Sequence, residues 1–304
     1  MWFKNLRLYR FTQPVDFDHE SLNDALAQQP FRPCGSLDPM RYGWVPPLGR
    51  HGQEWVHSAN GYHMICAKRQ EKILPAAVIN EHLEEKVADI KAQESRHVAR
   101  KEKQDLKDEV IFSLLPKAFS KSSLDFAYIA PREGLIVVNA ASAKKAEELL
   151  SALREALGSL SLIPVAPNTI PTQAMTHWLL HGDLPDDFTL GEECELRGGK
   201  DGRVVRFKNQ DLSADEVLNH LNAGMYVNRL ALTWKDAIHC IVDDQLAIKR
   251  VKFEDRILEQ ADEGNPETAA ETFDADFVVM TTELSAFIGA MMQAFGGEDT
   301  SWQG

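Results

Sequence analysis

The stretch AAVINEHLEEKVADIKAQESRHVARKEKQDLKDEVIFSLL, residues 76–115, decides how the chain is organised. Its composition is helical and dense in charge, and it opens directly after Pro75. Large apolar residues at helical spacing mark two legs: Ile79, Leu83, Val87 and Ile90 in the first, and Leu106, Val110 and Leu114 in the second. Between residues 91 and 105 the one large apolar residue is Val98, so the middle cannot pack onto a core. We expect two helical legs, packed near their outer ends, whose charged middle projects into solvent.

The regions on either side predict mixed α/β structure. Apolar residues of the N-terminal stretch MWFKNLRLYRF are set among polar ones, which predicts a strand. Asn60-Gly61 predicts the tight turn of a hairpin, and residues 124–158 predict a strand pair and a helix with Ser142 as its N-cap.

The second half of the chain shows a similar order. QAMTHWLLHG (173–182) is interpreted as strand-like, and a hairpin is expected around Gly198–Gly202. The segment from Ser213 to Glu216 has the pattern of a capping box. ADFVVMT (275–281) predicts a strand, and the helix after it repeats the earlier strand-then-helix order, which suggests an internal duplication.

The predicted domain organisation follows from these patterns. Residues 1–75 and 120–163 form a central α/β region, residues 76–119 a projecting helical tip, and residues 164–304 a second α/β region that holds the base and the C-terminal strand and helix.

The formal charge of −13 argues against nucleic-acid binding when taken alone. However, residues 254–276 hold nine acidic residues against one arginine, so the acidity is mainly a C-terminal feature. A basic surface elsewhere therefore remains open. The four cysteines are scattered without a C-x-x-C pair, which is typical of free thiols in a reducing cytoplasm.

No motif marks an active site. Ser142 and Lys145 form a formal S-x-x-K, but the companion elements are missing and an N-cap explains the serine. His51, His57, His63 and Cys66 do not match a standard zinc spacing, and the glycines at 198–202 do not match a phosphate-binding loop. We therefore expect no enzyme, no metal and no cofactor.

Two basic clusters remain. The first contains Arg96, Arg100, Lys101, Lys103 and Lys107 and continues to Lys117 and Lys121, but interleaved acidic residues make it typical of a solvated helix face. The second contains Arg197, Lys200, Arg203, Arg206 and Lys208, close to Gln210. Strand alternation puts Val204, Arg206 and Lys208 on one face, which could meet phosphates.

The whole chain resembles the RdgC family of recombination-associated DNA-binding proteins of proteobacteria. The resemblance rests on short motifs in order along the chain: WFKNL at 2–6, PCGS at 33–36, GWVPP at 43–47, QEKILP at 70–75, LKDEV at 106–110, LLPKAFS at 114–120, ASAKKAE at 141–147, LGSL at 157–160 and FDADF at 273–277.

The resemblance implies an α+β, horseshoe-shaped subunit of mixed and antiparallel sheets with helices and a projecting tip. Two subunits would close into a ring-shaped homodimer whose basic hole takes double-stranded DNA without sequence preference, with single-stranded DNA as a weaker partner. Such a nucleoid-associated, cytoplasmic protein would limit access of the strand-exchange recombinase during recombination and replication. The resemblance implies no catalytic activity, and we expect no membrane partner.

The resemblance also assigns residues. It implies DNA binding by Arg96, Lys117, which stands where relatives can have arginine, and Gln210, whereas Asn209 stands where a lysine can occur. With the two clusters, the predicted DNA-binding set is Arg96, Arg100, Lys101, Lys117, Arg203, Arg206, Lys208 and Gln210. Phe119 and Leu115 are expected at the subunit interface. The alternative is a non-catalytic scaffold dimer that binds proteins through its acidic C-terminal region and charged tip.

Overall fold

The computed structural model describes residues 1–13, 18–199 and 202–301 and shows an α+β fold. Within these residues it has eight α-helices and twelve strands. The helices are α1 (His19–Ala27), α2 (Ala76–Glu94), α3 (Arg100–Leu114), α4 (Ala143–Leu157), α5 (Pro171–His181), α6 (Asp215–Asn222), α7 (Asp255–Asp262) and α8 (Ala269–Ala294). The strands are β1 (Asn5–Phe11), β2 (Met40–Val45), β3 (Val56–Ala59), β4 (Tyr62–Lys72), β5 (Ser120–Ala130), β6 (Leu135–Val138), β7 (Leu162–Pro164), β8 (Phe188–Gly198), β9 (Val204–Lys208), β10 (Met225–Trp234), β11 (Ile238–Asp243) and β12 (Ile248–Phe253).

The chain divides into two compact units. Unit 1 comprises residues 1–26, 46–65 and 126–304, and unit 2 comprises residues 27–45 and 66–125. The three-part domain prediction drawn from the sequence stays a prediction.

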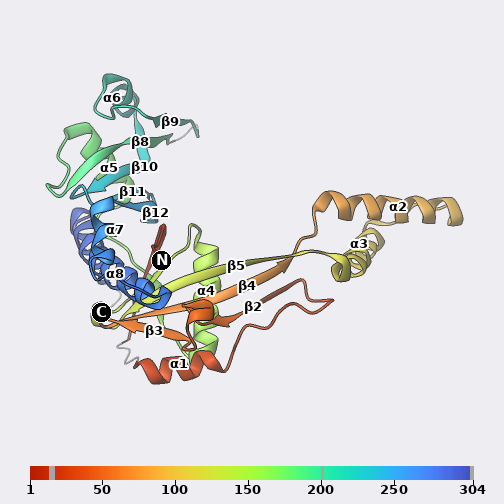
Figure 1. Cartoon of the computed structure of the whole chain (residues 1–304). Coiled ribbons are helices and arrows are strands. Elements are labelled where there is room, and N and C mark those ends of the chain that lie inside the picture. The colour runs from red at the N-terminus through yellow and green to blue at the C-terminus, as the bar shows by residue number, and fades with distance from the viewer. Residues whose placement is uncertain (14–17, 200–201, 302–304) are drawn as a thin grey trace. The chain divides into compact units, whose positions relative to one another are not determined.

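Unit 1 is built on an antiparallel sheet that contains the N-terminal strand, as expected. Its strands follow the order β6-β1-β12-β11-β10-β8-β9, so the N-terminal strand joins two halves of the sheet that are far apart in sequence. Strand β9 pairs with β8, as predicted for the second basic cluster, although Lys200 and Asp201 in the turn lie outside the described residues. The sheet therefore places β8 between β9 and β10, with β11 and β12 following beyond β10 (Figure 1).

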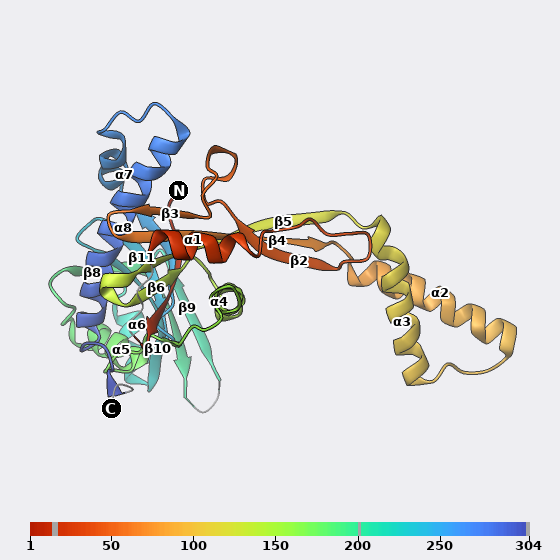
Figure 2. The ribbon, with the colours of Figure 1, turned by 90° about the horizontal axis from the view of Figure 1, so that it is seen from below.

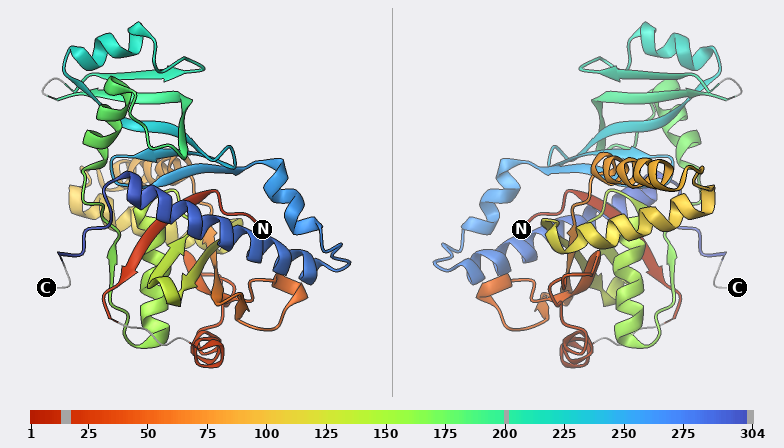
Figure 3. Two further views of the ribbon diagram at one scale, coloured as in Figure 1. Left: turned by 90° about the vertical axis from the view of Figure 1, so that its left-hand side faces the viewer. Right: turned by 90° about the vertical axis from the view of Figure 1, so that its right-hand side faces the viewer.

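Helix α8 supplies much of the core of unit 1, with α7 beside it (Figure 3). Its fully buried side chains recur at helical spacing and include Phe277, Leu284 and Phe287. The ring of Phe287 lies 5.7 Å from that of Trp234 and 6.5 Å from that of Phe188. Although α8 is long and apolar enough to cross a membrane, these side chains pack inside the unit.

The strand predicted over residues 275–281 is wrong, because this segment lies within α8. A capping box stabilises the N-terminus of the helix: Glu271 N donates to Thr268 Oγ1 at 3.2 Å, and Thr268 N donates to Glu271 Oε2 at 3.2 Å. Helix-spaced burial outweighs the strand preference of Val278 and Val279. The strand-then-helix repeat that suggested an internal duplication is therefore absent from this segment.

Two further local predictions need correction. Residues 171–181 form α5 and not a strand, because Pro171 opens a helix and Gly182, at φ 68°, ends it. Ser213 does not cap α6: its hydroxyl donates to Asp211 Oδ1 at 2.6 Å, and the helix begins after Ala214.

Two other local predictions are confirmed. Asn60 and Gly61 both have positive φ, at 50° and 81°, which is the geometry of the tight hairpin turn between β3 and β4. Ser142 Oγ accepts a hydrogen bond from Lys145 N at 3.4 Å, so the serine caps α4.

Unit 2 contains the two helical legs predicted from residues 76–115. Helices α2 and α3 pack together (Figure 1), and their buried side chains Ile79, Leu83 and Val110 lie away from the connection at residues 95–99. Strand β2 and the parts of β4 and β5 that belong to this unit lie side by side (Figure 2). Ile73 N donates to Phe119 O at 2.8 Å, which fixes Phe119 beside the end of β4.

Candidate nucleic-acid interface

The exposed side of β9 carries the cations expected there. Val204, Arg206 and Lys208 are all exposed and alternate with less exposed neighbours. In the pairing with β8, Arg206 stands opposite Glu195 and Lys208 opposite Glu193. The predicted alternation is therefore confirmed, and each of these cations faces a carboxylate across the strand pair.

Glu195 is a buried carboxylate, 3% exposed, that three arginines surround. Arg206 Nε donates to Glu195 Oε2 at 2.8 Å, and Arg197 Nε donates to Glu195 Oε1 at 3.1 Å. Arg229 Nη1 lies 3.9 Å from Oε2, and Asn228 Nδ2 donates to Oε1 at 3.2 Å. We call these five residues the Glu195 cluster. A buried carboxylate needs such partners, because an unpaired charge there would be costly.

The electrostatic balance of the cluster keeps Glu195 ionised. Burial by itself raises the pKa of this carboxyl, but hydrogen bonds from Arg206 and Arg197 and the charge of Arg229 outweigh it. The net result is a pKa below the ordinary value, so Glu195 carries its negative charge at neutral pH.

Irregular strand pairing assembles the cluster. Val227 stands opposite Leu196 and Arg229 opposite Glu195, so β10 has one extra residue there, Asn228. A second irregularity lies in β12, where Ile241 stands opposite Lys249 and His239 opposite Lys252. Arg250 in that bulge has φ 51°, a left-handed conformation that costs a non-glycine residue about 1–2 kcal/mol. Bulges re-aim side chains, and both of these turn a polar residue toward β8.

Further cations extend the surface across the sheet. Arg250 Nη1 lies 2.9 Å from Glu193 Oε2, and Lys249 Nζ lies 2.7 Å from Asp243 Oδ2. We call the connected set the basic sheet face: the cations Arg197, Arg206, Lys208, Arg229, Lys249 and Arg250, with the carboxylates Glu193, Glu195 and Asp243. Six cations against three carboxylates leave this face positive although the chain as a whole is negative. Such a face can hold the phosphates of a polyanion.

Sequence reasoning missed Arg229, Lys249 and Arg250. They stand on β10, which pairs with β8, and on β12, which joins β10 through β11, and these pairings cannot be deduced from local pattern. The pattern of YVNRLALTW was the available signal for Arg229, which lies between two buried residues, whereas Lys249 and Arg250 are adjacent and break the alternation of IKRVKF.

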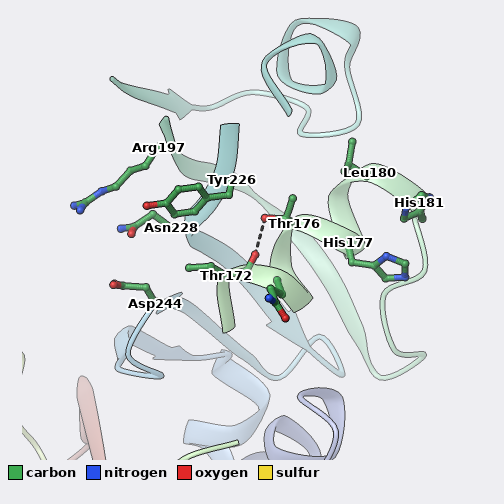
Figure 4. A pocket seen from close by; sticks show the side chains of 10 residues that line it. Thr172, Thr176, His177, Leu180, His181, Arg197, Tyr226, Asn228 and Asp244 are labelled. Carbon is green, nitrogen blue, oxygen red and sulfur yellow. Dashed lines mark hydrogen bonds between the residues drawn. The ribbon is translucent and has the colours of Figure 1, made fainter. Parts of the chain in front are cut away.

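A cavity of about 620 Å³ lies on the other side of the Glu195 cluster. Arg197, Tyr226 and Asn228 line one side of it, and Thr176 of α5 lines another (Figure 4). Thr176 Oγ1 donates to Thr172 O at 2.6 Å and accepts from Val227 N at 2.9 Å, which ties α5 to β10. The Glu195 cluster thus lies between this cavity and a second cavity, of about 320 Å³, on the basic sheet face of unit 1.

Four predicted residues, Arg203, Arg206, Lys208 and Gln210, lie in unit 1 at β9 or beside it. Arg206 and Lys208 belong to the basic sheet face. Arg203 is exposed just before the strand, and Gln210 N donates to Glu192 O at 3.3 Å.

The other four, Arg96, Arg100, Lys101 and Lys117, lie in unit 2 and are exposed. Arg96 is engaged by carboxylates: its Nε lies 2.5 Å from Glu94 Oε2, and its Nη1 and Nη2 lie 2.7 and 2.6 Å from the Glu102 oxygens. Hydrogen bonds to Glu102 and then Glu94 raise its pKa well above the ordinary value. A phosphate contact at Arg96 would have to replace these exposed ion pairs.

The two predicted interface residues differ in exposure. Phe119 is 84% exposed, whereas Leu115 is 4% exposed and packs inside unit 2. Leu115 can therefore support an interface but offers little surface to one. Single exposed apolar side chains are normal on soluble proteins, but they mark interaction surfaces when they form a contiguous patch. Unit 2 also exposes Ile73, Phe112 and Leu124, and Phe112 stands on a different element, α3, from Phe119.

The groups weighed for chemistry have structural partners. His57 Nε2 lies 3.0 Å from Asp274 Oδ1, and His63 Nδ1 lies 2.7 Å from Ser58 Oγ. Burial raises the pKa of the Cys66 thiol, and it raises those of Cys194 and Cys240 to about 12. Across residues 1–13, 18–199 and 202–301, no group of three or more His, Cys, Asp or Glu side chains is arranged to hold a metal.

Together, fold and site define an α+β protein that presents a positive sheet face in an acidic chain. Comparison with known proteins gives the family. The family model described as "Putative exonuclease, RdgC" matches residues 1–298. A recombination-associated protein RdgC of Aeromonas hydrophila subsp. hydrophila is 46% identical over 302 residues, covering 99% of this chain and 100% of the relative. Proteins of the same name from Tolumonas auensis and Pseudomonas entomophila are each 44% identical, covering 98% of this chain and 99% and 98% of the relatives. The chain belongs to the RdgC family.

Proposed function

We propose that this protein binds duplex DNA without sequence preference and acts in homologous recombination and replication. The observation that carries the proposal is the basic sheet face, where Arg206, Arg229 and Arg250 gather on one side of unit 1. Guanidinium groups bind phosphate oxygens bidentately, and contacts to the DNA backbone carry no sequence information. The relatives' printed name, recombination-associated protein, supports the same process.

We extend the proposal to the assembly. Two horseshoe-shaped subunits form a ring-shaped homodimer that encircles DNA and limits access of the strand-exchange recombinase, in the cytoplasm at the nucleoid. A two-fold ring needs two self-complementary contacts, and the exposed Phe119 is a suitable centre for one of them. Arg96, Arg100, Lys101 and Lys117 then contribute further phosphate contacts from unit 2. An outer surface that is acidic keeps the ring soluble.

The proposed role is not enzymatic. The family model's description names an exonuclease, whereas the relatives are named for recombination. Incubation of the protein and magnesium with two substrates, end-labelled linear DNA and circular DNA, tests whether the protein has exonuclease activity. Intact substrate is expected, and shortening of the linear DNA from its ends would contradict the proposal.

The test of DNA binding is fluorescence anisotropy with two duplexes of unrelated sequence, titrated over salt concentration. We expect equal affinities for the two duplexes and a logarithm of the binding constant that falls linearly with the logarithm of salt concentration. An absence of binding at low salt, or binding that salt does not weaken, would refute the proposal.

A second candidate function is a scaffold dimer that binds proteins. The acidic run at residues 254–276 favours it, because α7 and the start of α8 expose most of these carboxylates. Neutralising Glu259, Asp262 and Glu263 together separates the two functions. Duplex affinity stays unchanged or rises if the protein binds DNA, while a scaffold loses its protein partner.

A further inference from the structure

A cavity of about 320 Å³ lies on the basic sheet face, beside the Glu195 cluster. Residues of six strands line it, among them Glu193, Glu195, Arg206, Arg229 and Arg250. Its volume is within the range of small-ligand sites. The cationic side chains around it include Lys208 and Lys249, so an anion is the ligand that its chemistry favours.

Glu195 fixes the direction in which two arginines present their hydrogen-bond donors. Arg197 and Arg206 both use Nε–H toward this carboxylate, so the Nη groups of each fork are not engaged by it. The Nη groups are the pair that binds the two oxygens of a phosphate. Although Glu195 lines the cavity, it is 3% exposed and so offers little surface to a ligand that approaches from solvent.

Irregular strand pairing is a second, independent observation at this place. The extra residue Asn228 in β10 donates to Glu195, and the strained Arg250 of β12 reaches Glu193. Strand β8 is irregular here too, since Leu230 stands opposite Cys194 but Leu232 opposite Leu190. Three departures from regular pairing around one cavity are typical of a functional surface, where side chains must be re-aimed.

We propose that this cavity is a discrete site for one phosphodiester group of DNA, and that Glu195 is a positioning residue that orders Arg206, the arginine of this cavity that donates to it. The inference rests on the DNA-binding function proposed above. For the neutralisation of Glu195, the inference and simple electrostatics predict opposite changes in DNA affinity. Removing a negative charge from a DNA-binding face should strengthen binding by simple electrostatics, whereas loss of a positioning carboxylate weakens it.

The test compares full-length variants by anisotropy with a duplex at fixed, moderate salt and then over a salt series. Glu195→Gln should bind about tenfold more weakly, because the DNA must then order the Arg206 guanidinium itself. The slope of the logarithm of its binding constant against the logarithm of salt concentration should also become smaller, since fewer cations reach phosphates. A variant that is merely less stable would bind with the wild-type slope, because its folded molecules keep all their phosphate contacts. Arg229→Gln should lower the salt slope by about one.

The matched control is Glu192→Gln, which removes the same charge from the same strand. Glu192 is exposed and forms no ion pair with the described residues, so its neutralisation should leave affinity equal or slightly higher. Circular dichroism and thermal melting establish that each variant is folded. If Glu195→Gln does not fold, Arg229→Gln still tests the phosphate site. The Arg229 side chain is 45% exposed, so its replacement is expected to leave the fold intact.

The outcomes separate this inference from the proposed function. If the wild-type protein does not bind the duplex, the proposed function fails. If the wild-type protein binds, and folded Glu195→Gln binds equally or more tightly, the positioning role is overturned. An unchanged affinity and slope for Arg229→Gln overturns the site. Stabilisation of the wild-type protein by inorganic phosphate, with unchanged DNA affinity in both variants, would assign the cavity to free phosphate and also overturn it.

Discussion

Replacement of Phe119 by serine tests the ring most specifically. Phe119 is 84% exposed in the single chain, so an interface can still cover most of its surface. Complete burial of a phenylalanine stabilises by ~1.5–3 kcal/mol, and a two-fold contact buries two copies. Scaled to the exposed fraction, Phe119→Ser should weaken the contact by about 2.5–5 kcal/mol, which is roughly 60-fold to a few thousand-fold in its equilibrium constant.

The assay is retention on circular DNA. The protein is loaded at low salt onto a circular plasmid and onto the same plasmid after linearisation, and both are then washed at high salt. A closed ring stays on the circle after phosphate contacts are screened, but it slides off a linear end. The wild-type protein should remain on the circle alone, and Phe119→Ser should leave both DNAs.

The control is Phe112→Ser, which removes another exposed aromatic side chain from unit 2, 58% exposed on α3. It should behave as the wild type. Retention of Phe119→Ser on the circle at the wild-type level would refute the reasoning about Phe119. Release of the wild-type protein from the circle would refute the ring itself.

Two further predictions concern stability. Because the pKa of Glu195 is lowered in the folded protein, its ion pairs stabilise the fold above the ordinary value of 4.5, and that contribution is lost as pH falls below it. Thermal melting from pH 3 to 7 should therefore show a difference between wild type and Glu195→Gln that is constant above about pH 5 and shrinks in acid; a difference independent of pH would contradict this. Phe287→Ala in α8 should lower the free energy of unfolding by ~3–5 kcal/mol, because the ring is fully buried against Phe188 and Trp234. Urea denaturation measures it, and a loss below about 1 kcal/mol would show that α8 is not a core helix.

Local chemistry made part of this fold predictable. The two helical legs follow from apolar residues at helical spacing, and the hairpin at Asn60-Gly61 follows from two residues that tolerate positive φ. Where two local signals compete, the prediction failed. The run Val278-Val279-Met280 has strand character, but burial of Phe277, Leu284 and Phe287 on one side makes it helix.

The candidate site was predictable only where it lies within one strand pair. Arg206 and Lys208 were found because β8 and β9 are neighbours in sequence. Arg229 and Arg250 were missed because their strands join the face through long-range pairing. The bulge at Asn228 has no sequence signature of its own, so the environment of Glu195 required the structure.

The most direct test of the central claim reverses the charge of the basic β9 segment. Arg203, Arg206 and Lys208 are changed together to glutamate, and duplex affinity is measured by anisotropy over salt. The control reverses Arg132, Lys144 and Lys145, which are exposed in the same unit but lie outside these strands. Both variants change the formal charge equally, so a general charge effect would weaken them alike. We predict that the β9 variant loses at least about a hundredfold in affinity, with a salt slope lower by about three, while the control stays within a few-fold of wild type. Equal affinities for the two variants would contradict the account.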